Sequence, residues 1–146
     1  MFYGEHEHTI DRKGRLIVPS KFREVMKEHY VEKFVVTRGL DRCLFLFPED
    51  EWKAYEQKFR SLPITKGQAR QFNRIYFSGA VELTFDRQGR VLIPGYLKEF
   101  AKIKRDVVLV GVSSRVEIWA KESWKQFYET SVSSFEETAE KLWDVE

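Results

Sequence analysis

The sequence DRKGRLIVP, from Asp11 to Pro19, returns as DRQGRVLIP, from Asp86 to Pro94. The aspartate, both arginines, the glycine and the proline recur in identical places, and three aliphatic residues precede each proline. The offset from Asp11 to Asp86 is 75 residues, about half of the 146-residue chain. A pattern this long, repeated at this distance, indicates two tandem copies of one supersecondary unit.

The residues around the first copy predict a β-hairpin followed by a helix. Residues 2–10 alternate in polarity and are typical of a strand. Asp11 can accept hydrogen bonds from backbone amides two residues on, and Gly14 accepts a positive φ, so a turn should follow. A second strand over residues 15–18 would complete the hairpin, and a helix should begin after Pro19, where the strand must stop.

The rest of the chain predicts a mixed α+β protein. Each unit continues with a second hairpin, expected over residues 34–47 in the first unit and 107–119 in the second. The expected organisation is a first unit over residues 1–53, a helical connection over 54–78, a second unit over 79–124 and a C-terminal helical tail over 125–146. The tail is acidic and aromatic, which leaves open whether it packs on its own domain or on a neighbouring subunit.

Composition and motif content argue against several classes of protein. With 42% hydrophobic residues the chain can bury a core, and Cys43, its only cysteine, excludes an intrachain disulfide and fits a reducing compartment. His6 and His8 lie two apart on one expected strand face, but no third ligand completes a metal site. We find no P-loop, GxSxG or GxGxxG motif and no apolar run of membrane-spanning length. We expect a cytoplasmic protein that is not an enzyme and needs no cofactor or metal.

The first half of the chain is the more basic. Residues 1–75 contain 15 Lys and Arg against 11 Asp and Glu, a net charge of +4, whereas residues 76–146 contain 10 against 12, a net charge of −2. The N-terminal half should therefore offer the more favourable surface to a polyanion. Lys66, Arg70 and Arg74 lie four residues apart and are interpreted as a solvated helix face.

The repeated phrase is compatible with two kinds of chemistry. It places Asp11 four residues before Arg15, and Asp86 four residues before Arg90. One interpretation is a structural salt bridge at each turn, since exposed hairpin arginines are common and usually solvated. The other is DNA binding, because the arginine fork suits guanine O6 and N7 and a β-ribbon fits the major groove. Both stay open, because a duplicated structural device would be repeated as faithfully as a duplicated contact.

With both phrases 75 residues apart and an opening FYGEHEHTID, the chain resembles the MraZ family of bacterial transcriptional regulators over nearly its whole length. Each copy resembles an AbrB-like swapped-hairpin unit. The resemblance implies two units that interlock as one pseudo-twofold β-barrel core with peripheral helices. It also implies head-to-tail assembly into a ring of about 8 to 12 subunits, through a heterologous contact closed by rotation.

The same resemblance implies binding to double-stranded DNA, at short G-rich direct repeats in the promoter region of the division and cell-wall gene cluster that contains the protein's own gene. The expected effect is repression, and the expected location is cytoplasmic and nucleoid-associated. By position, the DNA-binding residues would be Arg12, Lys13, Arg15, Arg87 and Arg90, with Arg15 the principal one and Arg90 assigned to DNA or to the subunit contact. The motif residues with structural roles would be Asp11, Gly14, Pro19, Asp86, Gly89 and Pro94.

The alternative is an AbrB-like antitoxin or another protein-interaction module. The duplication within one chain and the aromatic tail argue against it, because such antitoxins usually carry one unit and a disordered tail. Steeply salt-dependent DNA binding would favour the regulator. Stable co-purification with a small toxic partner would favour the antitoxin.

Overall fold

A six-stranded antiparallel sheet forms the centre of the molecule in the computed structural model, which describes residues 1–28 and 33–143. Its strands, in spatial order, are β1 (Phe2–Thr9), β7 (Asp106–Ser113), β8 (Arg115–Ala120), β4 (Leu44–Pro48), β3 (Phe34–Arg38) and β5 (Val81–Leu83). Equivalent strands of the two units occupy equivalent positions from the two edges of the sheet. β1 and β5 are the edge strands, β7 and β3 lie next to them, and β8 and β4 are at the centre. The sheet therefore has a pseudo-twofold axis between β8 and β4, as two interlocked copies require.

A separate two-stranded ribbon contains the repeated phrases. It pairs β2 (Arg15–Ile17) with β6 (Arg90–Leu92) in antiparallel register. The hairpin expected between residues 2–10 and 15–18 is wrong, because β1 pairs along its whole length with β7 of the other unit. Only an isolated bridge from Ile10 to Leu16 joins the two expected partners. Each unit thus gives its second strand to the ribbon, which confirms the swapped hairpins that the family resemblance implied.

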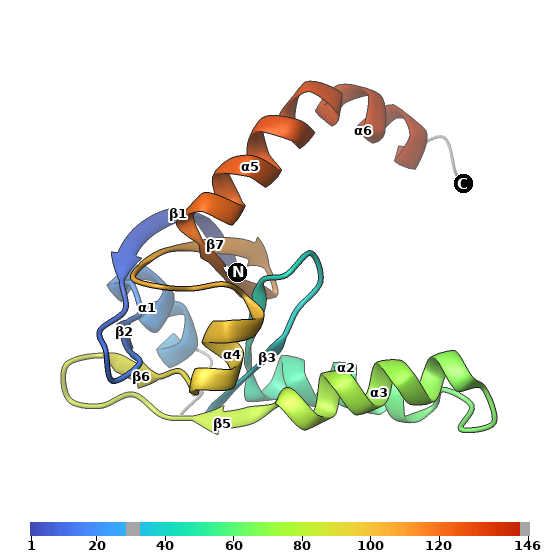
Figure 1. The fold of residues 1–146 in the computed structure, drawn as a ribbon, viewed down its shortest axis with the longest axis horizontal. Helices are drawn as coiled ribbons and strands as arrows, with labels where there is room; N and C mark the ends of the chain where they lie inside the picture. Colours follow the sequence, from blue (N-terminus) through green and yellow to red (C-terminus); the bar gives the residue numbers. More distant parts are fainter. Residues whose placement is uncertain (29–32, 144–146) are drawn as a thin grey trace.

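A helix begins directly after Pro19, as predicted, and further helices lie in the expected connection and in the expected tail. They are α1 (Ser20–Glu28), α2 (Glu49–Arg60), α3 (Gly67–Gly79), α4 (Gly95–Phe100), α5 (Lys121–Ser131) and α6 (Phe135–Trp143), with a 3-10 turn η1 (Val132–Ser134) between the last two. The expected helical tail consists of two helices, α5 and α6, joined by η1. In Figure 1, α1 and α4 lie close to the strands, whereas α2 with α3, and α5 with α6, extend away from them as two arms. None of the described helices is long and apolar enough to cross a membrane.

Alternation along the strands gives the sheet two apolar faces. On β3, Phe34 and Val36 point into a core between the sheet, the ribbon, α1 and α4, while Val35 points into a second core under α2 and α3. The second core holds Trp52 and Trp119, which are 8% and 3% exposed. These two tryptophans are therefore packing residues.

The strands surround the first core without forming a closed barrel. Within residues 1–28 and 33–143, β1 and β5 are the edges of the large sheet, and the ribbon pairs only with itself. The predicted α+β class with two tandem units is confirmed. The hydrogen bonds between strands do not close the sheet into a barrel among the described residues. The division into residues 1–53, 54–78, 79–124 and 125–146 stays a prediction.

Candidate nucleic-acid interface

The ribbon places the two copies of the phrase around a local twofold axis. Leu16 pairs with Val91, and these are equivalent residues, since they differ by the repeat offset of 75. The backbone amide of Ile93 donates to the carbonyl of Gly14 at 2.8 Å, and that of Val18 donates to the carbonyl of Gly89 at 3.1 Å. Each turn is therefore held by the strand of the other unit.

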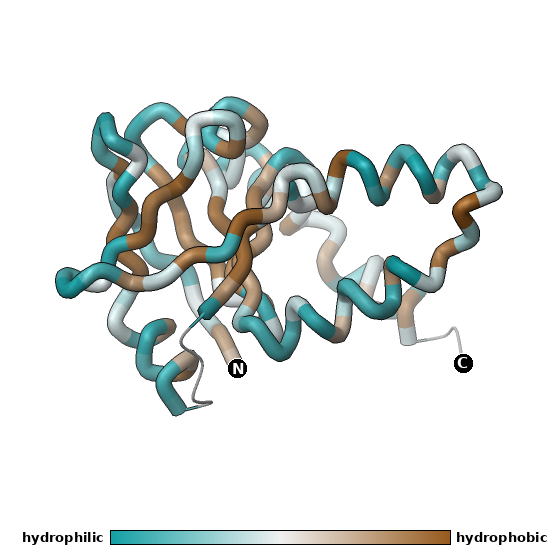
Figure 2. The backbone as a smooth tube through the Cα atoms, turned by 90° about the horizontal axis from the view of Figure 1, so that it is seen from below, coloured by the Kyte–Doolittle hydropathy of each residue, from teal (hydrophilic) through white to brown (hydrophobic). Residues whose placement is uncertain are grey.

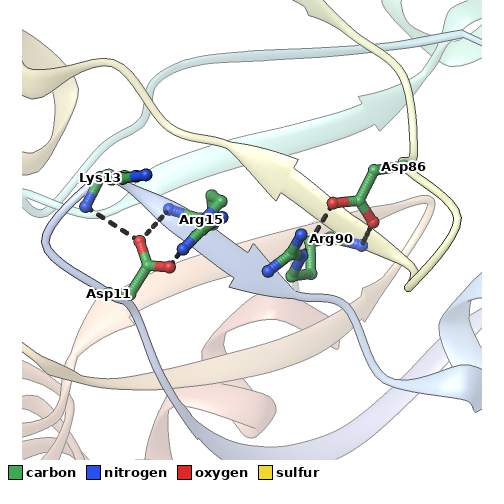
Figure 3. A network of polar contacts seen from close by, with 5 residues as sticks. All are labelled: Asp11, Lys13, Arg15, Asp86 and Arg90. Atoms are coloured by element: carbon green, nitrogen blue, oxygen red, sulfur yellow. Dashed lines mark hydrogen bonds and ion pairs between the residues drawn. The ribbon is translucent and has the colours of Figure 1, made fainter.

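An aspartate organises the first turn. One Asp11 oxygen accepts the backbone amides of Lys13 and Arg15, both at 2.9 Å, and the other accepts Nε of Arg15 at 2.6 Å (Figure 3). The backbone hydrogen bond from Arg15 is the main reason that the pKa of Asp11 lies below its usual value, and the Arg15 side chain adds to it. The carboxylate is thus charged at neutral pH and fixes both the turn and the arginine.

The second turn repeats this arrangement bond for bond. Asp86 accepts the backbone amides of Gln88 and Arg90 at 2.9 Å and Nε of Arg90 at 2.7 Å. The hydrogen bond from the Arg90 amide again comes first among the causes that lower the pKa of Asp86. The second copy has Gln88 where the first has Lys13. This difference leaves the geometry of the turn unchanged, because the aspartate accepts a hydrogen bond only from the backbone amide of that residue.

The glycines of the two turns are required by conformation and by space. Gly14 has φ of +85° and Gly89 has φ of +76°, both in the left-handed region. A Cβ at Gly14 would lie 2.5 Å from the carbonyl oxygen of Ile93, and one at Gly89 would lie 2.5 Å from a guanidinium nitrogen of Arg23. The first contact is with backbone and the second with a flexible side chain, so Gly14 is the more restricted of the two.

The salt bridges leave the outer edges of the arginines available. Arg15 and Arg90 bond their aspartates through Nε, and no hydrogen bond of their terminal nitrogens is found among the described residues. Their side chains are 38% and 27% exposed. The two interpretations of the phrase are therefore compatible: the salt bridge through Nε orients the guanidinium (Figure 3), and the two terminal nitrogens have no hydrogen bond among the described residues.

Three further cations of the phrases are exposed at the turns. Arg12, Lys13 and Arg87 form no ion pair within the part of the chain that the structure describes. Together with Arg15 and Arg90, they place five cations on the ribbon and its two turns. Pro19 and Pro94 end the two phrases, and the helices α1 and α4 begin directly after them.

Two features of this surface were not predicted from the sequence. Ile17 and Leu92, taken as part of aliphatic runs, are 44% and 57% exposed, because alternation turns them to the same side as Arg15 and Arg90. Arg23 of α1 donates from Nε to the carbonyl of Val18 and lies against the second turn. The alternation of side chains along a strand would have predicted that Ile17 and Leu92 are exposed. For Arg23, the signal in the sequence was a second cation, Lys98, at the equivalent position 75 residues later.

Other residues singled out from the sequence lie elsewhere. Arg70 and Arg74 lie on α3, which extends away from the ribbon (Figure 1). The His6 ring packs edge-on against Phe22 at 4.9 Å between centroids. No cluster of three or more His, Cys, Asp or Glu able to hold a metal occurs within residues 1–28 and 33–143. Cys43 is buried, and burial raises the pKa of its thiol well above the usual value.

Comparison with known proteins assigns the chain to a family. A family model described as "MraZ protein, putative antitoxin-like" matches residues 1–75 and again residues 76–145. Proteins named "Transcriptional regulator MraZ" from Pelotomaculum thermopropionicum and Caldanaerobacter subterraneus are each 54% identical to it, covering 99% and 97% of this chain and 97% and 96% of their own. One from Thermoanaerobacter sp. is 53% identical over 99% of both chains. The chain therefore belongs to the MraZ family, with one family unit in each half.

Proposed function

We propose that the protein is a sequence-specific DNA-binding transcriptional regulator whose ribbon enters the DNA major groove. The observation that carries the proposal is the β2–β6 ribbon itself, which presents two aspartate-oriented arginines whose terminal nitrogens have no hydrogen bond within residues 1–28 and 33–143. A two-stranded antiparallel ribbon is one of the elements that the major groove admits. The names of the related proteins, which are transcriptional regulators, support this assignment.

The chemistry of the ribbon divides its cations into two roles. Arg15 and Arg90 suit guanine, because two terminal nitrogens can donate together to O6 and N7 while Nε stays on the aspartate. Arg12, Lys13 and Arg87 are exposed on the turns and suit phosphate oxygens, which position the protein without specifying sequence. Arg15 is the principal base contact in this proposal, since the first half of the chain is the more basic.

The target and the assembly complete the proposal. Short G-rich direct repeats in the promoter region of the protein's own division and cell-wall gene cluster would be bound by consecutive subunits of a ring of about 8 to 12 copies, with repression as the outcome. Direct repeats are related by translation, so several head-to-tail copies can each contact one repeat. A single chain of net charge +2 binds a polyanion weakly, and several linked chains add their contacts through effective concentration.

The test is DNA affinity over a salt series for Arg15→Ala, Arg90→Ala and a control, Lys53→Ala, on repeat-containing and scrambled duplexes. Lys53 is an exposed cation of α2, 70% exposed even in its pair with Glu49. We expect Arg15→Ala to abolish the preference for the repeats and Lys53→Ala to leave it unchanged. An unchanged preference in Arg15→Ala, with the oligomer intact, would refute the assignment of Arg15.

A second function is favoured by one finding, the words "antitoxin-like" in the description of the matching family. In that case the apolar tail would bind a small toxic partner. Weak, salt-insensitive DNA binding together with stable co-purification of such a partner would replace the regulator with this function.

A further inference from the structure

The two phrases of the ribbon differ by one positive charge. The first phrase has three cations and the second has two, because Gln88 stands where the first has Lys13. The two turns lie at opposite ends of the antiparallel ribbon, and their aspartates make the same set of hydrogen bonds. The phrases alone therefore give the two ends of the ribbon the same shape and unequal charge.

A cation of the first unit lies over the second turn. Arg23 of α1 donates from Nε to the carbonyl of Val18 at 3.0 Å, and the amide of Val18 donates to the carbonyl of Gly89 at 3.1 Å. A Cβ built on Gly89 would lie 2.5, 2.6 and 2.8 Å from Nη1, Cζ and Nε of Arg23. These three atoms are almost equally close, so the guanidinium covers the glycine with its flat face.

The first turn is covered differently. Lys98 occupies the position equivalent to Arg23, 75 residues later. The three atoms nearest to a Cβ built on Gly14 belong to Ile93 and Leu92, with the carbonyl oxygen of Ile93 at 2.5 Å, and none belongs to Lys98. Backbone thus lies against the first glycine, and a cationic side chain lies against the second. The contact of Arg23 breaks the pseudo-twofold symmetry at the end of the ribbon that has fewer cations.

The guanidinium of Arg23 is fixed in place and still able to bind a ligand. The residue is half-buried, and apart from its bond to Val18 it has no hydrogen bond or ion pair within residues 1–28 and 33–143. The loop between β5 and β6, which contains the second turn, projects from the strands in Figure 1, and its tip is hydrophilic in Figure 2. An oriented guanidinium with two such terminal nitrogens suits bidentate contact with phosphate oxygens.

We propose that Arg23 contacts a DNA phosphate beside the second turn and supplies the cation that Gln88 leaves out of the second phrase. The inference rests on the DNA binding of the proposed function and adds a residue from outside both phrases. Each end of the ribbon then presents three cations to the DNA backbone. Because phosphate contacts position a protein without reading sequence, Arg23 contributes to affinity and not to the preference for the repeats.

The alternative is that Arg23 only braces the second turn. A brace would act on DNA through the orientation of Arg90, so its removal would reduce the preference for the repeats. A phosphate contact acts through its charge, so its removal would reduce the salt dependence of binding on any sequence. A cation placed elsewhere on the same turn would compensate for a lost phosphate contact, but it would not replace a brace.

The test is DNA affinity over a salt series for wild type and three variants, on repeat-containing and scrambled duplexes. Arg23→Gln removes the charge over the second turn, and Lys98→Gln, the matched control, removes a charge at the equivalent position of the other unit. The double variant Arg23→Gln with Gln88→Lys returns a cation to the second turn, where the first turn has Lys13. Circular dichroism and light scattering confirm that the four proteins have the same fold and mass.

The expected result is a change in slope without a change in preference. Each lost phosphate contact lowers the slope of log affinity against log salt by about 0.9, because one fewer set of counterions is released. Arg23→Gln should therefore lower the slope by about 0.9 for each subunit on the DNA, on both duplexes alike. Lys98→Gln should leave the slope unchanged, and the double variant should recover the wild-type slope. The preference for the repeats should be the same in all four proteins.

Four outcomes would contradict the inference. An unchanged slope in Arg23→Gln, against a steep wild-type slope, would overturn it, and so would a loss of preference for the repeats, which would make Arg23 a brace. A lowered slope that Gln88→Lys does not restore would show that Arg23 does not replace the missing cation. An equal loss in Lys98→Gln would show that the contact with the second turn has no special role. Salt-insensitive binding by the wild type would instead overturn the proposed function itself.

Discussion

Replacement of Gly14 by alanine should destabilise the protein by several kilocalories per mole. The residue has φ of +85°, and an alanine Cβ would lie 2.5 Å from the backbone carbonyl oxygen of Ile93. Left-handed backbone costs an alanine about 1–2 kcal/mol. Pressure against fixed backbone adds about 1–3 kcal/mol, as overpacking typically does. The expected loss is therefore about 2–5 kcal/mol in the free energy of unfolding.

Two other glycines provide graded controls. Gly89 has a similar φ of +76°, but its Cβ would meet the side chain of Arg23, which can move, so Gly89→Ala should cost less than Gly14→Ala. Gly95 begins α4, and a Cβ there would meet nothing within 4 Å. Gly95→Ala should therefore stabilise by about 0.4–1 kcal/mol, through the entropy of the unfolded chain.

The assay is urea unfolding followed by tryptophan fluorescence, at one protein concentration because assembly contributes to stability. The expected order of stability is Gly95→Ala, wild type, Gly89→Ala and then Gly14→Ala. If Gly14→Ala cost no more than Gly89→Ala, the close approach of the first turn to Ile93 would be wrong. If the Gly14→Ala variant were as stable as the Gly95→Ala variant, the left-handed conformation of Gly14 would be wrong.

Three further changes test other parts of the structure. Asp11→Ala should weaken binding to repeat-containing DNA while Asp50→Ala, an exposed carboxylate of α2, leaves it unchanged; equal affinities would show that Asp11 does not orient Arg15. Both Asp11 and Asp86 have a lowered pKa, so NMR titration should place their midpoints below 3.8. Their contribution to the free energy of unfolding should be fully present above pH 3.8 and should disappear as the pH falls through the lowered pKa values. A midpoint at or above 3.8 would contradict the hydrogen bonds of that turn. Phe22→Ala, at a fully buried position in contact with Phe2 and His6, should cost about 3–5 kcal/mol in urea unfolding, against less than 0.5 kcal/mol for the exposed Lys21→Ala.

Local chemistry was readable from the sequence because it depends on neighbouring residues. The turn at Asp11–Gly14 and the start of a helix directly after Pro19 both follow from short-range spacing. The salt bridge of Asp11 with Arg15 was one of two interpretations, and the four-residue separation allowed it directly. Such features need no knowledge of which strand lies beside which.

Strand exchange was not readable from the same pattern. The alternation that buries Leu16 is satisfied equally by pairing with β1 or with β6, because both partners offer an apolar side to the core. Only the family resemblance distinguished the two. The contact of Arg23 with the second turn also depends on the tertiary arrangement, so it became visible only with the structure.

The most direct test of the central claim compares wild type with Arg15→Lys on repeat-containing and scrambled duplexes at one fixed salt concentration. Lysine keeps the charge but loses the second terminal nitrogen and the Nε bond to Asp11. A good bidentate base contact supplies about 1–3 kcal/mol of discrimination, so the ratio of specific to non-specific affinity should fall about 5- to 150-fold. Affinity for scrambled DNA should stay nearly constant. An unchanged ratio, in a protein of wild-type mass, would contradict the claim that Arg15 contacts the bases.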